Sequence, residues 1–301
     1  MAVAPVPKRV WTILEMLQWG TSYLSEKGFD ESRLTIELLL CHVLNLKRIQ
    51  LYTSFDKPLT ERELSEFKGL LQRRLQHEPL QYIVGTAEFM GLEFIVDRRV
   101  LIPRPETEVL VEQVVRYAKE HFLGQPLRIL DLGTGSGCIA VSLAALLDNV
   151  SVVAFDKSSD AVDVARINAQ KNGVEKRITL SVQDLFRISG SDFTSKFHFV
   201  VSNPPYISKV EFEALQPEIR EFEPSSALTD EGDGFSFYRR IAEIGRLFLE
   251  TEGAIFVEHA YNQSTSVQKI FTEAGWSSVQ MLSDYGGNHR CLVATQFRET
   301  R

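Results

Sequence analysis

From residue 127 to residue 295, short apolar runs alternate with segments of helical periodicity, and this alternation constrains the fold more than any other feature. The runs are rich in β-branched and aromatic residues, which is typical of buried strands. We expect strands at residues 127–132, 151–155, 178–182, 197–202, 254–258, 278–282 and 291–295. Strands that alternate with helices form mostly parallel sheets with helices on both faces. The sequence therefore predicts an α/β domain with a seven-stranded, mostly parallel sheet.

The first part of the chain has a different pattern, with amphipathic helices and no strand-like runs. Apolar residues recur at helical spacing in three groups: Val10, Trp11, Leu14 and Leu17; Leu34, Leu38 and Cys41; Leu64, Phe67, Leu71 and Leu75. We expect Asp30 to cap the second helix, and Thr60 to begin the third with a capping box that includes Glu63. Such helices pack into a small bundle, which we place at residues 1–85.

Residues 86–105 connect the helical part to the α/β part, and their sequence pattern differs from both. Residues 89–97, with Gly91 in a turn, predict a short β-hairpin. Pro103 and Pro105 flank Arg104, and Pro105 suits the first turn of a following helix. The α/β domain then occupies residues 106–301.

Charge and composition narrow the classes of partner. The chain of 301 residues has a net charge of −7, which argues against a protein held to nucleic acid mainly by phosphate contacts. Its longest apolar stretch, around residues 139–147, is far too short to span a membrane. Cys41, Cys138 and Cys291 are far apart and lack metal-ligand spacing, which is typical of a reduced intracellular protein. We therefore expect a cytoplasmic protein without a metal, a membrane segment or a direct nucleic-acid partner.

The strand at 127–132 runs into a glycine-rich turn, Asp131-Leu132-Gly133-Thr134-Gly135-Ser136-Gly137. Glycine permits positive φ and lets the backbone approach a ligand closely. The dinucleotide fingerprint requires a third glycine where this chain has Cys138, so the turn suits a ligand without phosphates better. A tight turn that binds nothing explains the glycines alone equally well.

Acidic residues end three consecutive predicted strands: Asp131, Asp156 and Asp184, the last followed by Leu185. Asp156 follows Asp131 at about the offset at which an acidic residue binds ribose hydroxyls. Asp184 has the position to hold an adenine amino group. Either Asp156 or Asp184 can instead cap a helix, and for Asp184 alone that is the better explanation. Together with the glycine turn, the three acids outline a pocket for a positively charged nucleoside.

The strand at 197–202 ends in Asn203-Pro204-Pro205-Tyr206. The prolines end the strand and fix the backbone at its carboxyl end, where ligands bind in open α/β sheets. Asn203 offers an amide and Tyr206 a flat stacking face. By itself this run is best explained as a proline-rich turn, and the glycine motif upstream is what favours a ligand site. The acidic segment 207–234 is expected to be a long structureless loop, of the kind that serves as a lid.

Together, the glycine turn, the three acids and Asn203-Pro204-Pro205-Tyr206 resemble class I S-adenosylmethionine-dependent methyltransferases. The segments 79–85 and 101–108, with Glu223-Pro224, narrow the resemblance to the HemK/PrmC family, the glutamine methyltransferases of peptide chain release factors. The resemblance covers nearly the whole chain. It implies a Rossmann-like class I methyltransferase domain preceded by the small all-α bundle and the β-hairpin linker.

The resemblance also implies an activity and a site. The expected reaction transfers a methyl group from S-adenosyl-L-methionine to the side-chain amide nitrogen (N5) of the glutamine in the Gly-Gly-Gln motif of class I release factors. Cofactor binding would involve Asp131, Gly133, Thr134, Gly135, Ser136, Gly137, Asp156, Asp184, Leu185 and Asn203. Substrate binding would involve Asn203, Pro204, Pro205 and Tyr206, of which Asn203, Pro204 and Tyr206 are the expected catalytic residues. The helical bundle would dock the substrate, and the enzyme would be monomeric.

Three other functions remain open at this point. A DNA amino-methyltransferase would share Asn-Pro-Pro-Tyr, but should carry a basic groove or a target-recognition domain. A non-catalytic nucleoside-binding module would not need Asn203 and Tyr206. A nicotinamide dehydrogenase is the weakest alternative because of Cys138. No role follows from the sequence for Arg104 or Glu106.

Overall fold

The computed structural model describes residues 10–297 and divides the chain into two compact units, Met1–Val84 and Gly85–Arg301. The first unit contains α1 (Ile13–Glu26), α2 (Ser32–Leu44), α3 (Arg48–Thr53), α4 (Glu61–Leu75) and α5 (Leu80–Val84). Its core is made by side chains from these helices, among them Ile13, Leu24, Ile36, Leu39 and Phe67. Throughout residues 10–297, no helix is both long and apolar enough to cross a membrane.

The helix boundaries confirm one predicted cap and correct another. Thr60 accepts a hydrogen bond from the Glu63 amide and Glu63 reaches back, so the predicted capping box is present. Asp30 does not cap α2. The helix begins at Ser32, so the capping position is Glu31, which has a left-handed backbone conformation. Val10 also lies before its helix, and 64% of it is exposed.

The buried face of α2 differs from the predicted one. Ile36, Leu39 and Leu40 are fully buried, whereas Leu34 and Leu38 are only half-buried. Apolar residues crowd this helix so densely that two different faces have helical spacing. Packing against α1 and α4 decides which of the two is buried.

The second unit opens with the predicted hairpin, β1 (Thr86–Phe89) and β2 (Leu92–Ile95), paired antiparallel. Met90 and Gly91 form its turn with φ of 52° and 71°. Two successive positive φ angles match the right-handed twist of hairpin strands. The helix α6 (Pro105–His121) follows, with Pro105 in its first turn as predicted.

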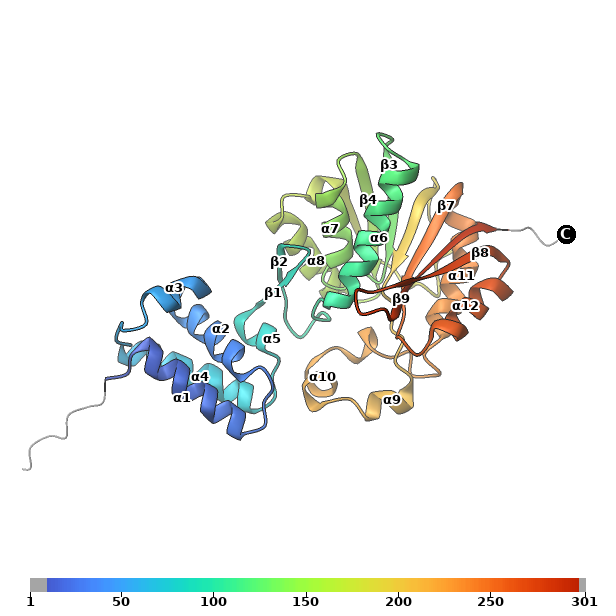
Figure 1. The fold of residues 1–301 in the computed structure, drawn as a ribbon. Helices are drawn as coiled ribbons and strands as arrows, with labels where there is room; N and C mark the ends of the chain where they lie inside the picture. The colour runs from blue at the N-terminus through green and yellow to red at the C-terminus, as the bar shows by residue number, and fades with distance from the viewer. Residues whose placement is uncertain (1–9, 298–301) are drawn as a thin grey trace, which may run out of the picture. The chain divides into compact units, whose positions relative to one another are not determined.

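A seven-stranded sheet forms the centre of this unit (Figure 1). Its strands are β3 (Leu127–Leu132), β4 (Val150–Asp156), β5 (Ile178–Val182), β6 (Phe197–Ser202), β7 (Leu249–Glu258), β8 (Trp276–Ser283) and β9 (His289–Phe297). The strand order is β5-β4-β3-β6-β7-β9-β8, and only β9 runs antiparallel to its neighbours. The predicted seven-stranded, mostly parallel sheet is confirmed.

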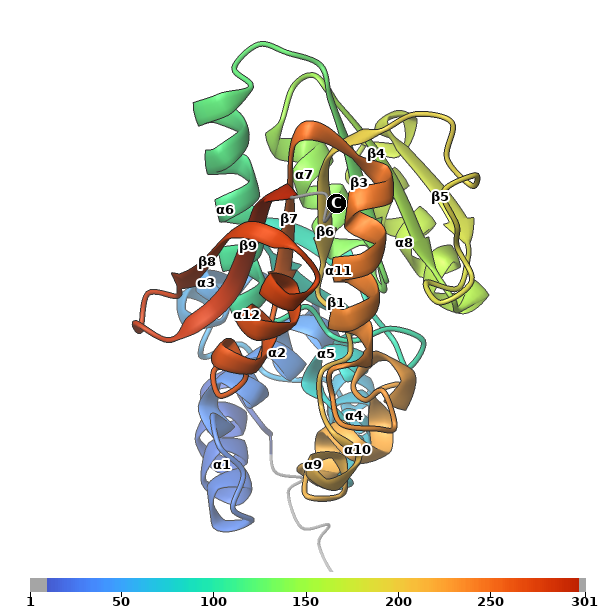
Figure 2. The same ribbon diagram turned by 90° about the vertical axis from the view of Figure 1, so that its right-hand side faces the viewer.

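Helices cover both faces of the sheet, as Figures 1 and 2 show. One face carries α6, α7 (Cys138–Leu146) and α8 (Ser159–Lys171), and the other carries α11 (Ser236–Phe248) and α12 (Ser264–Glu273). Two short 3₁₀ turns, η1 (Glu175–Arg177) and η2 (Ser225–Ala227), complete the connections. The central strands β3 and β6 have almost all of their side chains buried between these layers, which explains their near-continuous apolar runs in the sequence.

The segment 207–234 is not a structureless loop, contrary to the prediction. It contains α9 (Lys209–Glu213) and α10 (Pro217–Phe222). Ser208 begins α9 with a capping box, and Pro217 occupies the first turn of α10. A capping box and a proline in the first turn are both local signals that start a helix. The loop prediction rests instead on the length and acidity of the segment, which do not exclude short helices.

Candidate active site

Two of the sequence motifs meet because their strands are neighbours. In the register of β3 and β6, Leu132 lies opposite Ser202, so the glycine turn and Asn203 leave the sheet side by side. The Ser202 hydroxyl donates to the Leu132 carbonyl oxygen at 2.7 Å and joins the two strand ends. From β3 the chain proceeds to β4 and β5 on one side and returns to β6 on the other. This reversal of strand order is where open α/β sheets bind ligands.

A cavity of about 380 Å³ opens at this position. The predicted site residues that line it are Gly133, Thr134, Gly135, Ser136, Asp156, Asp184, Leu185, Asn203, Pro204 and Pro205. Asp131, Gly137 and Tyr206 are not among the lining residues. The sheet therefore brings ten of the predicted residues to one cavity.

Asp131 supports the glycine turn from below. It is fully buried, and its Oδ2 accepts a hydrogen bond from the Thr134 hydroxyl at 2.6 Å. Burial raises the pKa of the Asp131 carboxyl to about 7, and the Thr134 hydroxyl partly opposes this shift. The carboxyl therefore holds the turn in place and does not reach the cavity.

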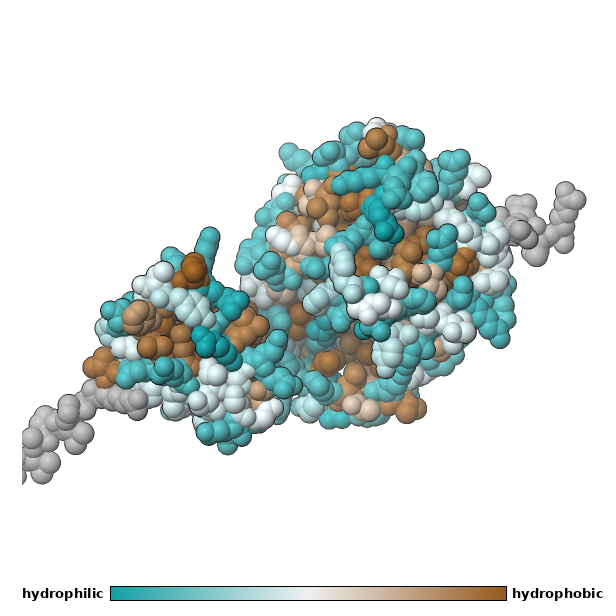
Figure 3. Space-filling model, in the orientation of Figure 1, coloured by the Kyte–Doolittle hydropathy of each residue, from teal (hydrophilic) through white to brown (hydrophobic). Residues whose placement is uncertain are grey.

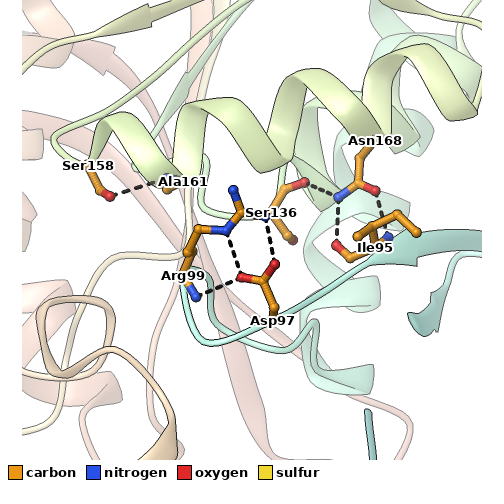
Figure 4. A network of polar contacts seen from close by, with 7 residues as sticks. All are labelled: Ile95, Asp97, Arg99, Ser136, Ser158, Ala161 and Asn168. Atoms are coloured by element: carbon orange, nitrogen blue, oxygen red, sulfur yellow. Dashed lines mark hydrogen bonds and ion pairs between the residues drawn. The ribbon is translucent and has the colours of Figure 1, made fainter. Parts of the chain in front are cut away.

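The glycine turn is also clamped from α8. Asn168 is fully buried, and its Nδ2 donates to the Ser136 carbonyl at 2.8 Å. The same side chain bonds both backbone groups of Ile95 in the hairpin, accepting at 2.7 Å and donating at 3.0 Å (Figure 4). Gly137 has a φ of 80°, and a Cβ there would lie 3.0 Å from the Ala165 Cβ. A side chain at this position would push α8 away from the turn.

Asp156 and Asp184 occupy neighbouring strand ends, and each organises its own turn. Asp156 accepts from the Gly135 and Ser158 amides, both at 2.9 Å. Asp184 accepts from the Phe186 amide at 3.0 Å. No helix begins at Asp184, so this residue is not the helix cap that the sequence allowed. Each carboxylate oxygen has a further lone pair that can accept from a ligand.

Asn203 presents its side chain to the cavity in a defined orientation. Its Nδ2 donates to the Thr107 hydroxyl at 3.0 Å, which leaves Oδ1 on the other side of the amide. Pro204, immediately after it, is buried and fixes the backbone. Asn203 thus offers a hydrogen-bond acceptor.

Tyr206 is not among the residues that line the cavity, and both its hydroxyl and its carbonyl are hydrogen-bonded. Its hydroxyl donates to the Glu258 Oε1 at 3.4 Å, and its carbonyl accepts from the Gln263 Nε2 at 2.8 Å. Burial and the neighbouring Glu258 raise the pKa of the Tyr206 hydroxyl far above its usual value, so the ring stays neutral. Gly234 packs so closely here that a Cβ would lie 2.5 Å from the Tyr206 carbonyl oxygen.

Arg104, which had no role from the sequence, fastens the 207–234 segment beside the cavity. Its guanidinium donates to the carboxylate of Glu223, and the Ile102 amide donates to the same carboxylate at 3.2 Å. Glu223 is 5% exposed, and burial raises the pKa of its carboxyl. The Arg98 guanidinium lies 4.5 Å from the centre of the Phe222 ring and adds a second attachment.

Four structural residues of the site had no functional signal in the sequence: Thr107, Asn168, Ser202 and Glu258. Each acts through a hydrogen bond to a partner far away in the chain. The sequence indicates a structural role for such a residue only where a polar side chain interrupts or ends an apolar run. Ser202 and Glu258 are of this kind, since each is the last residue of an apolar strand. His198, by contrast, accepts from the Arg128 amide at 3.0 Å and is half-buried in β6.

Comparison with known proteins gives consistent matches along the chain. Residues 15–85 match the family model of the PrmC N-terminal domain, and residues 106–233 match that of the methyltransferase small domain. The release factor glutamine methyltransferase of Geobacter sulfurreducens is 43% identical over 283 residues, covering 94% of this chain and 96% of the relative. The enzyme of the same name from Chlorobaculum tepidum is 42% identical over 292 residues, covering 95% and 97%.

Among solved structures, the hMettl16 catalytic domain in complex with the MAT2A 3'UTR hairpin 1 has a TM-score of 0.55 and 15% sequence identity. The match covers 92% of this chain and 91% of the hMettl16 chain. At this low sequence identity, the likeness supports the fold alone. The sequence matches carry more, since they extend over nearly the full length of both chains at more than 40% identity. The chain belongs to the release factor glutamine methyltransferase family, the one that its motifs resemble.

Proposed function

We propose that this protein transfers a methyl group from S-adenosyl-L-methionine to the N5 atom of the glutamine in the Gly-Gly-Gln motif of class I peptide chain release factors. The observation that carries the proposal is the orientation of Asn203 at the end of β6. Its amide nitrogen is bound to Thr107, so its oxygen is available to a substrate N–H in the cavity. The primary amide of a glutamine side chain carries two N–H donors on a planar nitrogen, and therefore matches this acceptor.

Two features of the cavity support S-adenosyl-L-methionine as the cofactor. At Gly133 and Gly135 a Cβ would meet nothing within 4 Å, so the turn leaves open space for a ligand against its backbone. Asp156 and Asp184 line the same cavity and offer carboxylate oxygens that can accept from a ligand's hydroxyl and amino groups. We assign Asp156 to the ribose hydroxyls and Asp184 with Leu185 to the adenine. When bound, the cofactor supplies a methyl group activated by a positively charged sulfur.

Alignment is the main requirement that the protein has to meet. A carboxamide nitrogen is a weak nucleophile, because its lone pair is delocalised into the carbonyl group. Asn203 Oδ1 and the Pro204 carbonyl are proposed to accept the two amide hydrogens and so fix the nitrogen in the cavity. Holding the reacting atoms in line contributes a large share of the rate, and the amide proton leaves after the methyl group has arrived.

The helical unit is proposed to recognise the release factor. Figure 3 shows apolar residues among hydrophilic ones on its surface, and Leu14, Trp19, Ile49 and Phe55 are exposed by 40% or more. Trp19 stacks on Tyr23 at 5.2 Å and meets Trp11 edge-on at 5.8 Å. Exposed apolar groups of this kind are typical of surfaces that bind another protein.

Mass spectrometry tests the proposed reaction directly. The purified protein is incubated with a release factor and an isotope-labelled methyl donor, and the label is located by peptide sequencing. We expect one methyl group on the glutamine of Gly-Gly-Gln and none on a release factor with alanine at that position. Faster transfer to adenine in DNA would favour the amino-methyltransferase instead.

We further propose that the enzyme works as a cytoplasmic monomer. Its net charge of −7 favours solubility, and Cys41, Cys138 and Cys291 are all free thiols. Light scattering on the purified protein should give a mass close to 34.2 kDa. A mass twice as large would contradict the monomer.

A further inference from the structure

The turn that follows β5 carries an aromatic side chain to which the sequence assigned no role. Phe186 lines the cavity of about 380 Å³ beside Asp184 and Leu185, and it is 48% exposed. Leu185, by contrast, is buried. A half-exposed phenylalanine at a cavity wall offers apolar surface that a ligand can cover. Phe186 therefore belongs to the side of the cavity that is assigned to the adenine.

A second aromatic side chain holds the Phe186 ring. Phe237, in the first turn of α11, also lines the cavity. The two rings meet edge-on, with centroids 5.1 Å apart and an interplanar angle of 73°. This is a preferred geometry of aromatic pairs, because the positive edge of one ring meets the negative face of the other. Whichever ring contributes its edge, Phe237 leaves at least one face of Phe186 uncovered.

The backbone of the same turn is held by Arg240, which lies further along α11. Its Nε donates to the Leu185 carbonyl at 3.1 Å, and its Nη2 donates to the Ile188 carbonyl. Its Nη1 donates to the Glu243 carboxylate at 2.9 Å, so all three nitrogens of the guanidinium are engaged. A guanidinium presents its donors in a rigid planar fork. It can therefore hold two carbonyl oxygens of one turn at a fixed separation.

The turn is thus ordered by its own hydrogen bonds and by one face of α11. Phe237 and Arg240 are three residues apart in the helix and so lie on the same face of it. Within the turn, the Asp184 carboxylate accepts from the Phe186 amide at 3.0 Å, and the Asp184 carbonyl accepts from the Arg187 amide at 2.8 Å. A wall that is ordered in advance lowers the entropic cost of binding a ligand.

We propose that Phe186 stacks on the base of the cofactor, and that Arg240 is a positioning residue that holds the Phe186 turn in the shape that this contact requires. The inference rests on the proposed function, because it concerns the cofactor assigned there. A flat heterocyclic base suits an aromatic ring, and stacking accepts any base because each has a π-face. Phe186 then contributes affinity, and the Asp184 carboxylate contributes the choice of adenine.

Isothermal titration calorimetry with S-adenosylhomocysteine, the product of the cofactor, tests the stacking without methyl transfer. Phe186→Ala removes the ring, and Phe186→Tyr keeps it. We expect Phe186→Ala to bind the product about tenfold to a hundredfold more weakly, the usual range for a lost stacking partner, and Phe186→Tyr to stay within about twofold of the wild type. Wild-type affinity in Phe186→Ala, or a Phe186→Tyr variant as weak as Phe186→Ala, would overturn the stacking.

The same titration tests the role of Arg240. Arg240→Lys keeps the charge but loses the fork, and we expect it to bind the product about tenfold more weakly. Arg166→Lys is the matched control, because Arg166 is also paired with an acid three residues away in its helix, and its affinity should be that of the wild type. Added to Phe186→Ala, Arg240→Lys should cost less than about twofold more, since both changes act through one turn.

Two losses that simply multiply in the double variant would indicate a general loosening of the fold and would overturn the positioning role. Circular dichroism checks that each variant is folded. Arg240→Gln retains a donor for one of the two carbonyls, and it gives the same comparison if Arg240→Lys does not fold.

These titrations also separate the inference from the proposed function. A wild type that binds S-adenosylhomocysteine, with the expected losses in the variants, but does not methylate the release factor would exclude the proposed acceptor and leave the base contact standing. A wild type that methylates the release factor while Phe186→Ala binds the product normally would exclude the base contact and leave the proposed function standing.

Discussion

At the scale of single residues, the strand-end carboxylates differ in their surroundings, and their surroundings separate their roles. Asp131 is fully buried under the glycine turn, whereas Asp156 lines the cavity and binds two backbone amides. The buried Asp131 carboxyl contacts the turn through the Thr134 hydroxyl, whereas a carboxylate at a cavity wall can bind a ligand. Two aspartates near the ends of neighbouring strands thus support different functions.

Asp131 should make stability depend on pH. Its pKa is about 7 in the folded state against 3.8 in the unfolded chain. The folded state holds this proton more tightly, so its contribution to the free energy of unfolding falls as pH rises through that interval. Asp131→Asn should lack this decline in urea denaturation at pH 4.5 and 7.5. Asp163→Asn, at an exposed helix position, should parallel the wild type, and a parallel Asp131→Asn curve would refute the assignment.

Asp156→Ala should weaken binding of S-adenosyl-L-methionine. The change removes a ligand acceptor and also releases the Gly135 amide of the turn. We expect a loss of about 1–3 kcal/mol in binding free energy, the usual cost of leaving such groups unpaired. Isothermal titration calorimetry measures it directly. Unchanged affinity would mean that Asp156 serves only the loop backbone.

Asn203→Ala should separate turnover from cofactor binding. Asn203 aligns the acceptor, so we expect kcat to fall by about a hundredfold or more while cofactor affinity stays nearly constant. Single-turnover kinetics and calorimetry on the same preparation give the two quantities. An Asn203→Ala enzyme with full turnover would exclude the alignment role.

At the scale of elements, the glycine turn owes its shape to a helix and a hairpin that are not adjacent to it in sequence. Asn168 in α8 bonds the turn at Ser136 and the strand β2 at Ile95 (Figure 4). One side chain therefore joins three elements, and the hairpin becomes part of the cavity's support. The close approach of Gly137 to Ala165 depends on the same contact between α8 and the turn.

Asn168→Ala should reduce both stability and cofactor affinity. It leaves the Ile95 amide, the Ile95 carbonyl and the Ser136 carbonyl without their partner, and we expect the free energy of unfolding to fall by about 3 kcal/mol. The loosened turn should also bind the cofactor more weakly in calorimetry. Asn172→Ala, one turn further along and partly exposed, loses contacts to the Glu93 and Asn168 carbonyls and should cost much less. Equal effects of the two variants would contradict the clamp.

At the scale of the whole molecule, chemistry and recognition are proposed to reside in different units. All residues that line the 380 Å³ cavity lie within Gly85–Arg301, and the exposed aromatic group of α1 lies within Met1–Val84. Each unit has its own hydrophobic core. A protein with this division can bind its cofactor in one unit and its protein substrate with both.

Removal of residues 1–84 should therefore leave cofactor binding measurable while methylation of an intact release factor collapses. Calorimetry and the mass-spectrometric assay report the two activities, and circular dichroism checks that the remaining unit is folded. A point variant, Trp19→Ala, tests the same idea in the full chain and should raise KM for the release factor. Normal methylation by the shortened protein would mean that the helical unit has no recognition role.

Much of the fold could be predicted from the sequence because its signals are local. Buried strands appear as apolar runs, Thr60 and Glu63 form a cap within one turn, and Gly91 marks a hairpin turn. The ends of β3 and β6 were identified as the ligand side because glycines and prolines terminate strands in a recognisable way. Each of these patterns reflects a backbone conformation set by residues that are close together in the sequence.

Other features were decided only by the tertiary structure. The two possible apolar faces of α2 are equal in periodicity, and packing selects one. Thr107 and Asn203 are 96 residues apart, and their hydrogen bond depends on the order of strands in the sheet, which leaves no periodic trace in the sequence. The sequence by itself determined which residues end the strands, whereas the tertiary structure decided what each contacts, because a hydrogen bond between distant residues forms only when the sheet brings them together.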